Sequence, residues 1–400
     1  MHRENFPILN NNNNLVYFDN GATTLKPKCV IDSIVDYNSK YTSNAHRGDY
    51  KNSLTVDNLY EGTRKKVMQF INAKEVSEIV FTSGTTDSLN RIVFGYFKNI
   101  LHKDDEVLIT LSEHASNVLP WFVLQEELGI KVKFIPLNEN NEVTLENVKS
   151  VINENTKVIS LAHITNVIGD TRPIKEISKL AHENDVYMVL DAAQSVPHIK
   201  VDVQELDVDF MAFSAHKMYS TTGVGVLYGK FDLLDKMKPL AYGGGMNAIF
   251  TKDGYYELRE IPTRLEAGTQ NIEGVLALGS VIDYLNSIGM DNIYKYEHNL
   301  RKYLIDELSK LDFIDLYNKD NDSAIVAFNI KGVFSQDTAV YLDKYNICVR
   351  AGNHCAKILN NVFHINNTCR ISLSFYNTKE EIDLLINVLK NSKNIWQEIL

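Results

Sequence analysis

Short runs of β-branched and aromatic residues alternate with amphipathic stretches through the first two thirds of the chain. Several runs are apolar on both faces, which is typical of strands in a sheet covered on both sides. Between the runs, apolar residues recur at helical spacing, as they do through 59–71 and 174–181. The pattern predicts an α/β domain with a mainly parallel, seven-stranded sheet. The predicted strands are 79–82, 106–110, 131–135, 157–162, 186–190, 210–214 and 224–228.

The pattern changes after about Val281. A long amphipathic stretch, 282–311, leads into apolar runs at 324–330, 347–350 and 370–375 and then into a closing helix with one apolar face. Thr378 and Glu381 have the spacing of a capping box at the start of that helix. These features predict a smaller α+β C-terminal domain. We therefore expect a large domain of residues 20–283 and a small domain formed by residues 1–19 and 284–400.

Composition excludes several classes of protein. The 400 residues are 44% hydrophobic, which is enough for a large core. The net charge of −10, without any concentrated basic stripe, argues against a nucleic-acid partner. No apolar run reaches the roughly 18 residues of a membrane-spanning helix, and the N-terminus lacks the apolar core of a signal peptide. We expect a cytoplasmic protein without a membrane partner.

The cysteines point to a reducing compartment. Only four occur, without zinc-ligand spacing, so we expect free thiols and no metal site. Cys355 differs from the others because it follows Gly352-Asn353-His354, a loop signal, and is therefore expected to be exposed and reactive. The other three occupy predicted helix or strand positions, where a thiol is most often a small buried hydrophobe. They are Cys29, Cys348 and Cys369.

A lysine and an aspartate follow successive predicted strands. Lys217 closes the run Phe213–Lys217, and Asp191 lies 26 residues before it. Pyridoxal phosphate (PLP) needs an amine for its Schiff base and a buried anion to keep its pyridine nitrogen protonated. A lysine after a strand is by itself most often a solvated loop charge. Paired with Asp191, Lys217 favours a PLP site.

Residues 82–88 lie between a predicted strand and the helical run 89–97. Backbone amides there and the hydroxyls of Thr85 and Thr86 can meet an anion at a helix N-terminus, although an ordinary helix cap is the alternative. Beside Lys217 and Asp191, phosphate binding is the better interpretation. The residues that flank the lysine and can supply further donors are Ser214 and His216.

Four further residues suit such a site. His114 and Asn166 each follow a strand; an imidazole can stack on a PLP ring and move protons, and an amide can donate to the ring's phenolic oxygen. Taken singly, His114 is more simply interpreted as a hydrogen-bonded loop residue and Asn166 as part of a turn. Arg350 and Arg370 lie in predicted strands, where an unpaired arginine is costly. A substrate carboxylate is a natural bidentate partner, and a structural ion pair is the alternative.

These segments together resemble the Suf-type (group II) cysteine desulfurases, in the class V aminotransferase family of fold-type I PLP-dependent transferases. The resemblance extends from about Tyr17 to Asn387. The segments that carry it are 17–22, 45–48, 84–86, 113–114, 191–194, 214–217, 267–269, 350–356 and 369–377.

The resemblance implies a role for each matching residue. Lys217 would hold PLP as a Schiff base, Asp191 would pair with the pyridinium nitrogen, and His114 would stack over the ring. Gln194 would contact the phenolic oxygen, and Asn166 would lie near the ring or the substrate. The implied phosphate ligands are Thr85, Thr86, Ser214, His216 and, from the second subunit of a homodimer, Thr269.

The resemblance also implies the reaction. Arg370, supported by Arg350 and Asn166, would hold the carboxylate of L-cysteine. Cys355 would attack the substrate sulfur and carry it as a persulfide, leaving L-alanine. The sulfur would then pass to an acceptor protein, for iron–sulfur cluster assembly.

Three positions depart from the family pattern. Ala115 and Asn353 stand where many relatives have a histidine, and Gln336 stands near a histidine of relatives that pass sulfur to a zinc-containing acceptor. The last departure puts that route in doubt. The alternative functions are a selenocysteine lyase or another PLP enzyme of this scaffold, such as a transaminase, and a catalytically silent PLP-fold assembly partner. Cys355 argues against a transaminase, which does not need a cysteine in this loop. The presence of Lys217, Asp191, Arg370 and Cys355 together argues against a catalytically silent partner.

Overall fold

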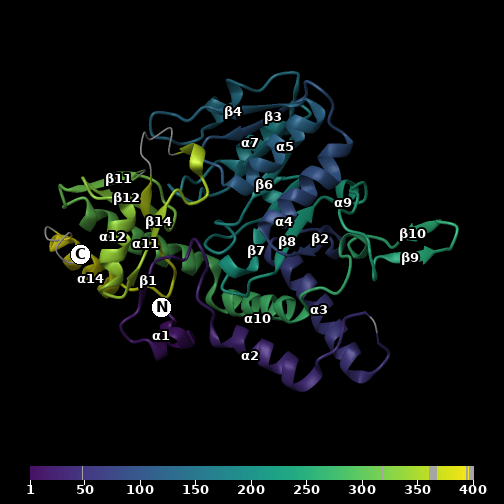
Figure 1. The fold of residues 1–400 in the computed structure, drawn as a ribbon, viewed down its shortest axis with the longest axis horizontal. Helices are drawn as coiled ribbons and strands as arrows, with labels where there is room; N and C mark the ends of the chain where they lie inside the picture. The colour runs from purple at the N-terminus through teal and green to yellow at the C-terminus, as the bar shows by residue number, and fades with distance from the viewer. Residues whose placement is uncertain (47, 318, 360–366, 393–394, 396–400) are drawn as a thin grey trace.

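The computed structural model of the chain describes residues 1–46, 48–317, 319–359, 367–392 and 395, so Arg47, in one of the resembling segments, lies outside it. A seven-stranded sheet with the order β2-β8-β7-β6-β5-β3-β4 forms its centre (Figure 1). β8 runs antiparallel to both neighbours, and the other adjacent pairs are parallel. The strands are β2 (Ile79–Thr82), β3 (Glu106–Thr110), β4 (Lys131–Ile135), β5 (Thr156–Ala162), β6 (Tyr187–Asp191), β7 (Phe210–Ser214) and β8 (Gly225–Gly229).

The seven predicted strands are confirmed, each to within one residue at either end. Six of them are buried along nearly their whole length, as runs that are apolar on both faces require. β4 is the exception, because it lies at the edge of the sheet and exposes Lys131 and Lys133. Charged side chains on an edge strand discourage pairing with another chain.

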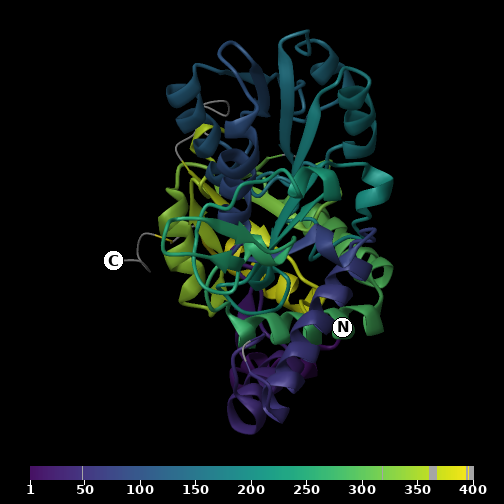
Figure 2. The ribbon, with the colours of Figure 1, turned by 90° about the vertical axis from the view of Figure 1, so that its right-hand side faces the viewer.

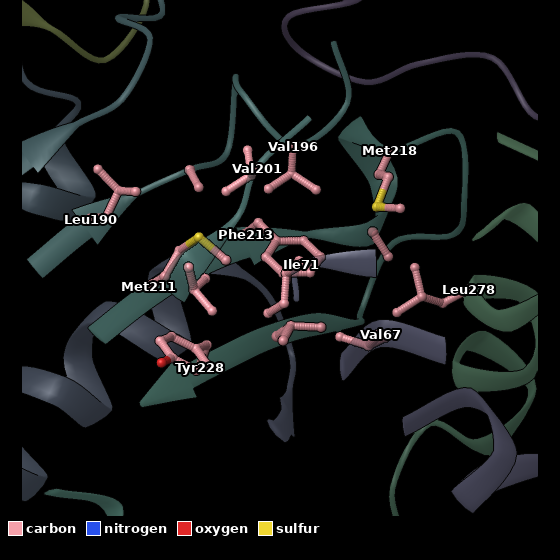
Figure 3. Close-up of a cluster of buried hydrophobic side chains, with 14 of the residues drawn as sticks. Val67, Ile71, Leu190, Val196, Val201, Met211, Phe213, Met218, Tyr228 and Leu278 are labelled. Carbon is pink, nitrogen blue, oxygen red and sulfur yellow. The ribbon is translucent and has the colours of Figure 1, made fainter. Parts of the chain in front are cut away.

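Alternate residues of a strand pack on opposite faces of the sheet, since the side-chain period is two. Met211 and Phe213 of β7 join an apolar cluster with Val67 (Figure 3). Phe210 of the same strand joins a second cluster with Trp121. The first face is covered by helices including α3 (Lys51–Phe70), α7 (Ile174–His182) and α10 (Ile272–Ile288), and α2 (Lys28–Asp36) packs on α10. The second face is covered by α4 (Thr85–Asn90), the π-helical η4 (Arg91–Tyr96) and α5 (Leu119–Leu128).

The predicted helix through 59–71 is confirmed as part of α3, but Leu59 is 40% exposed instead of facing the core. Figures 1 and 2 show α2 and the start of α3 extending from the body of the molecule beside α10. The hairpin of β9 (Asn247–Phe250) and β10 (Tyr256–Leu258) projects from another side. Among the described residues, none of the helices combines the length and apolar character that crossing a membrane requires.

A second sheet lies in the C-terminal part. Its order is β11-β12-β15-β14, with antiparallel pairs throughout. The N-terminal segment joins this part: β1 (Val16–Tyr17) pairs with β13 (Ile347–Cys348), and Phe18 belongs to a separate apolar cluster formed mainly by residues of the C-terminal part. The remaining elements here are β11 (Ile314–Tyr317), β12 (Ile325–Ile330), β14 (Arg350–Gly352), β15 (Thr368–Ser372), α11 (Met290–Leu308), α12 (Ser335–Asp343) and α14 (Lys379–Lys390).

The structure divides two of the runs that the sequence pattern marks in this part. The stretch 282–311 is not one helix: it is the end of α10 and then α11, separated at Gly289, whose φ of 86° breaks the helix. The run 347–350 is divided between β13 and β14, which pair with different strands. The capping box of Thr378 and Glu381 is confirmed. The domain division at 283/284 stays a proposal, and α10 runs through it.

The chain contains further short elements, which connect those above. They are η1 (Arg3–Asn5), α1 (Pro7–Asn11), η2 (Tyr37–Tyr41), η3 (Val76–Glu78), η5 (Phe97–Asn99), η6 (Ala115–Asn117), α6 (Leu145–Lys149), α8 (Val203–Leu206), η7 (Ala215–Lys217), α9 (Phe231–Leu234) and η8 (Thr263–Leu265).

Candidate active site

A cavity of about 240 Å³ opens where the carboxyl ends of β5, β6 and β7 face the small sheet. Parallel strands bring the residues that follow them to one edge, which is where α/β folds bind ligands. Every predicted site residue except one lines this cavity. Those residues are Thr85, Thr86, His114, Asn166, Asp191, Gln194, Ser214, His216, Lys217, Arg350, Cys355 and Arg370.

Thr269 is the exception. It is exposed and lies outside the cavity of its own chain, where its hydroxyl accepts a hydrogen bond from Asn44 Nδ2 at 3.3 Å. Its expected contact with a phosphate in the second subunit stays a proposal.

Lys217 and Asp191 form the charged floor of the cavity. Asp191 is the last residue of β6, and Lys217 ends the turn η7 that follows β7. Burial raises the pKa of Asp191 to about 6, and the nearby Lys217 opposes that rise. Burial lowers the pKa of Lys217, against the attraction of Asp191. Lys217 keeps some surface open to the cavity, so its amine is both poorly solvated and accessible.

Hydroxyl groups gather at the start of α4. Ser214 Oγ accepts a hydrogen bond from the backbone N–H of Thr85 at 2.7 Å and lies 2.7 Å from Thr85 Oγ1. Thr86 Oγ1 lies 2.7 Å from the hydroxyl of Ser116, which also lines the cavity and which the sequence interpretation missed. Its only signal in the sequence is its place two residues after His114. Hydroxyls and amides at a helix start make an anion site.

His114 is held in one tautomer. Its Nδ1 accepts a hydrogen bond from the backbone N–H of Ser116 at 3.1 Å, so a neutral ring carries its proton on Nε2. Burial, assisted by Lys217, lowers the pKa of His114 to about 4. The ring is therefore neutral at physiological pH.

Two amides join the halves of the cavity. The side chain of Asn166 donates from Nδ2 to the backbone carbonyl of His354 at 2.7 Å, and the backbone carbonyl of Asn166 accepts from Arg370 Nη1 at 2.8 Å. Gln194 donates from Nε2 to the carbonyl of Gly21 at 2.8 Å. Asn166 thus connects the strand β5 region to the loop that carries Cys355.

The two arginines lie on neighbouring strands. Arg370 in β15 is buried, whereas Arg350 in β14 has a side chain that is 46% exposed. Both face Asp19, whose carboxylate accepts from Arg370 Nη2 at 3.1 Å. The ion pair that the sequence left open as an alternative is therefore present. Sequence reasoning did not select Asp19.

Cys355 lies on a loop of unusual backbone conformation. His354 and Cys355 have φ values of 50° and 58°, in the left-handed region that β-carbon-bearing residues seldom adopt. The departures Ala115 and Asn353 both contact this turn: Ala115 N–H donates to the carbonyl of Cys355 at 2.8 Å, and Asn353 Oδ1 accepts from its N–H at 3.2 Å. The turn presents the thiol to the cavity.

The exposure expected of Cys355 is confirmed, whereas the burial expected of the other three cysteines is found only for Cys369. Cys355 is exposed, Cys369 is buried, and Cys29 and Cys348 are half-buried. Burial raises the pKa of the Cys29 and Cys348 thiols, and it raises the pKa of the Cys369 thiol to about 12. A thiol with a raised pKa is a poor nucleophile at neutral pH. Within the described part of the chain, no cluster of His, Cys, Asp and Glu has the arrangement of a metal site.

The chain is similar to known proteins over nearly its whole length. The sequence profile of the Aminotransferase class-V family matches residues 16–385. A probable cysteine desulfurase from Halalkalibacterium halodurans is 41% identical, with 98% of each chain covered. The apo structure of a cysteine desulfurase from Thermococcus onnurineus NA1 superposes with a TM-score of 0.93 at 37% identity, covering 97% of this chain and 96% of that one.

A structure of the cysteine desulfurase CsdA from Escherichia coli, in an S-sulfonic acid form, gives a TM-score of 0.92 at 33% identity, covering 98% of this chain and 97% of that one. The matches span nearly the whole chain in sequence and in structure. The chain therefore belongs to the aminotransferase class-V family, among its cysteine desulfurases.

Proposed function

We propose that the protein is a PLP-dependent cysteine desulfurase, which converts L-cysteine to L-alanine and holds the released sulfur as a persulfide on Cys355. The observation that carries the proposal is one cavity that combines an exposed thiol, a poorly solvated lysine beside a buried carboxylate, and a buried arginine.

The unpartnered groups of the cavity suit this cofactor and substrate. Among the described residues, Asn166 Oδ1, His216 Nδ1 and Arg370 Nε are buried without a hydrogen-bond partner. A buried polar group without a partner costs about 1–3 kcal/mol, so a ligand that satisfies these groups recovers free energy. A phosphate near His216 and a carboxylate near Arg370 are ligands of the right kind.

PLP, when bound, supplies an electron sink for the bond-breaking steps at the substrate. Lys217 would hold it covalently, Asp191 would pair with its ring nitrogen, and Gln194 would lie at its phenolic oxygen. The neutral ring of His114 would stack on it. The phosphate would be held by Thr85, Thr86, Ser214 and His216. Ser116, whose hydroxyl is hydrogen-bonded to that of Thr86, would support this site.

The chain's own residues then move the proton and the sulfur. Arg370, with Arg350 and Asn166, would bind the carboxylate of L-cysteine. The lowered pKa of Lys217 favours its neutral amine, which can take the proton from the substrate Cα. The thiolate of Cys355 attacks the substrate sulfur: an S–S bond forms, the substrate Cβ–S bond breaks, and Cβ keeps the electron pair and is protonated to the methyl group of L-alanine.

Mass spectrometry after incubation with L-cysteine tests the proposal. We expect one extra sulfur on Cys355, together with alanine. Cys355→Ala should retain the cofactor but lose sulfur transfer by about two or more orders of magnitude, the scale expected when a covalent nucleophile is removed. Cys29→Ala is the matched control and should transfer sulfur normally. Sulfur on other cysteines but never on Cys355 would refute the proposed nucleophile.

Borohydride reduction and peptide mapping test the lysine. We expect the cofactor label on Lys217, and Lys217→Ala should abolish turnover even if some cofactor stays bound. Burial also lowers the pKa of Lys26, to about 8. A label on Lys26 instead of Lys217 would refute the assignment of Lys217 as the Schiff-base lysine.

The wider setting is also part of the proposal: a cytoplasmic homodimer of Suf type that passes sulfur to an acceptor protein for iron–sulfur cluster assembly. The large domain would comprise residues 20–283, and the small domain residues 1–19 and 284–400. Selenocysteine lyase activity is the second candidate. It is distinguished by Cys355→Ala, which should still release selenium from L-selenocysteine because selenium leaves more readily than sulfur and needs the thiol less.

A further inference from the structure

Asp19 lies beside the two arginines assigned to the substrate carboxylate, yet the proposed mechanism gives it no task. Its Oδ1 accepts a hydrogen bond from Arg370 Nη2 at 3.1 Å, and its Oδ2 lies 3.9 Å from Arg350 Nη1. The side chain of Asp19 is 20% exposed and that of Arg370 only 2%. One carboxylate therefore bridges two guanidinium groups.

The register of the small sheet explains why a bridge is needed. Arg350 and Arg370 are direct partners across the antiparallel pair β14–β15. Like charges at such opposed positions repel each other. Asp19 can offset this repulsion because its own backbone is fixed on the same sheet, by a bridge to Ser372. Two guanidinium groups and one carboxylate leave one net positive charge, which a substrate carboxylate would neutralise.

The contacts of Arg370 leave part of its guanidinium free. Asp19 holds Nη2, and the carbonyl of Asn166 accepts from Nη1 at 2.8 Å. Gly21 packs so closely that a Cβ there would lie 3.0 Å from Arg370 Cζ. Nε, by contrast, is buried without a partner among the described residues. The guanidinium is thus held in place through both Nη atoms, and its Nε–H is left for a ligand.

We infer that Asp19 is a positioning residue, which holds Arg350 and Arg370 in the arrangement that accepts the substrate's α-carboxylate and so sets the preference for amino acids over simple amines. The inference rests on the proposed function, since it takes Arg370 as the carboxylate-binding residue. A merely structural Asp19 would affect ligands with and without a carboxylate alike.

Two ligands that differ only in the carboxylate test this inference. L-alanine and ethylamine are titrated into the holoenzyme, and their dissociation constants are read from the visible absorption of the cofactor. Asp19→Asn should weaken L-alanine about tenfold or more, the scale of a hydrogen bond to a charged group, and leave ethylamine unchanged within about twofold. The KM for L-cysteine should rise, with a much smaller change in kcat.

The remaining variants separate the possible outcomes. Asp19→Glu keeps the negative charge. Its ratio of the affinities for L-alanine and ethylamine should lie between the ratios of wild type and Asp19→Asn. Asp19→Glu therefore serves as the test if Asp19→Asn does not fold. In an Arg370→Gln background, Asp19→Asn should cause little further change in that ratio, because the two act as a unit. Asp235→Asn, which breaks a surface ion pair with Arg264, is the control.

Equal weakening of both ligands, unchanged binding of L-alanine, or tighter binding of L-alanine by the Asp19 variants would overturn the inference. Failure of the proposed function looks different. If Arg370→Gln itself leaves the ratio of the two affinities unchanged, Arg370 is not the carboxylate ligand. If only the Asp19 variants leave it unchanged, the positioning role alone is wrong.

Discussion

Asp191 affects the stability of the cofactor-free protein, because its carboxylate is buried. An aspartate in an unfolded chain titrates near 3.9, whereas burial raises the pKa of Asp191 in the folded chain to about 6. The folded state therefore holds this proton more tightly than the unfolded state. The resulting stabilisation is fully present below about pH 4 and is lost as the pH rises through about 6. At neutral pH the ionised carboxylate destabilises the cofactor-free fold.

Asp191→Asn should consequently stabilise the cofactor-free protein at pH 7, by about 1–3 kcal/mol from the size of the shift, while it abolishes activity of the holoenzyme. The amide oxygen can still accept the 3.0 Å hydrogen bond from Ala193 N–H. Urea unfolding at pH 7 and at pH 4 measures the effect, and the gain should be nearly absent at pH 4. Asp235→Asn should change little at either pH. A cofactor-free Asp191→Asn protein less stable than wild type at pH 7 would contradict this account.

Single residues differ in how far the sequence could predict them. Lys217 and Asp191 each follow a strand that the apolar pattern marks clearly, so their common edge follows from the fold class. Asp19 and Arg370 are 351 residues apart, and nothing near either one signals the other. The bridge between Asp19 and Ser372, together with the hydrogen bond from Ser372 N–H to the carbonyl of Phe18, brings them together.

At the scale of elements, the turn that precedes α4 depends on the strand beside it. A Cβ on Gly225 of β8 would lie only 2.4 Å from Gly84 Cα, and Gly84 begins the predicted phosphate site. Because a Cβ is fixed rigidly to its own backbone and Gly84 Cα is a backbone atom, neither can move aside without shifting the strand or the turn. The close approach places the N–H of Thr85 on Ser214 Oγ.

Gly225→Ala should therefore weaken PLP binding about tenfold or more, since overpacking of this kind typically costs 1–3 kcal/mol. Titration of the cofactor-free protein with PLP measures the dissociation constant. Gly62→Ala is the matched control: a Cβ at this position of α3 would meet no described atom within 4 Å beyond the adjoining backbone of its own helix, and alanine should stabilise the helix by about 0.5–1 kcal/mol. Unchanged PLP affinity of the Gly225 variant would show that the turn does not bind the phosphate.

The elements also mark where prediction from sequence ends. Strands with two buried faces were predictable to within a residue because their apolar runs are continuous and bounded by polar turns. The break at Gly289 was not, since apolar residues continue on both sides of it. The turn at His354 and Cys355 carries no glycine at its left-handed positions, so its shape depends on tertiary contacts such as that of Asn166.

At the scale of the whole molecule, the position of Thr269 bears on whether two subunits share an active site. Twelve predicted site residues converge in one cavity, whereas Thr269 lies on the surface of the same chain. No property of one chain can place it near a phosphate in another, and the prediction rests on resemblance alone. If it is right, each active site combines Lys217 and Cys355 of one subunit with Thr269 of its partner.

Mixing inactive variants tests this arrangement. Thr269→Asp should be inactive because its carboxylate would repel the phosphate. In a hybrid dimer with Lys217→Ala, one of the two sites has both groups intact, so random exchange should restore at most about a quarter of wild-type activity. Lys217→Ala mixed with Cys355→Ala is the control and should restore none, because both residues line the same cavity of one chain. A fully active Thr269→Asp enzyme, or an active monomer in sedimentation, would show that each chain works alone.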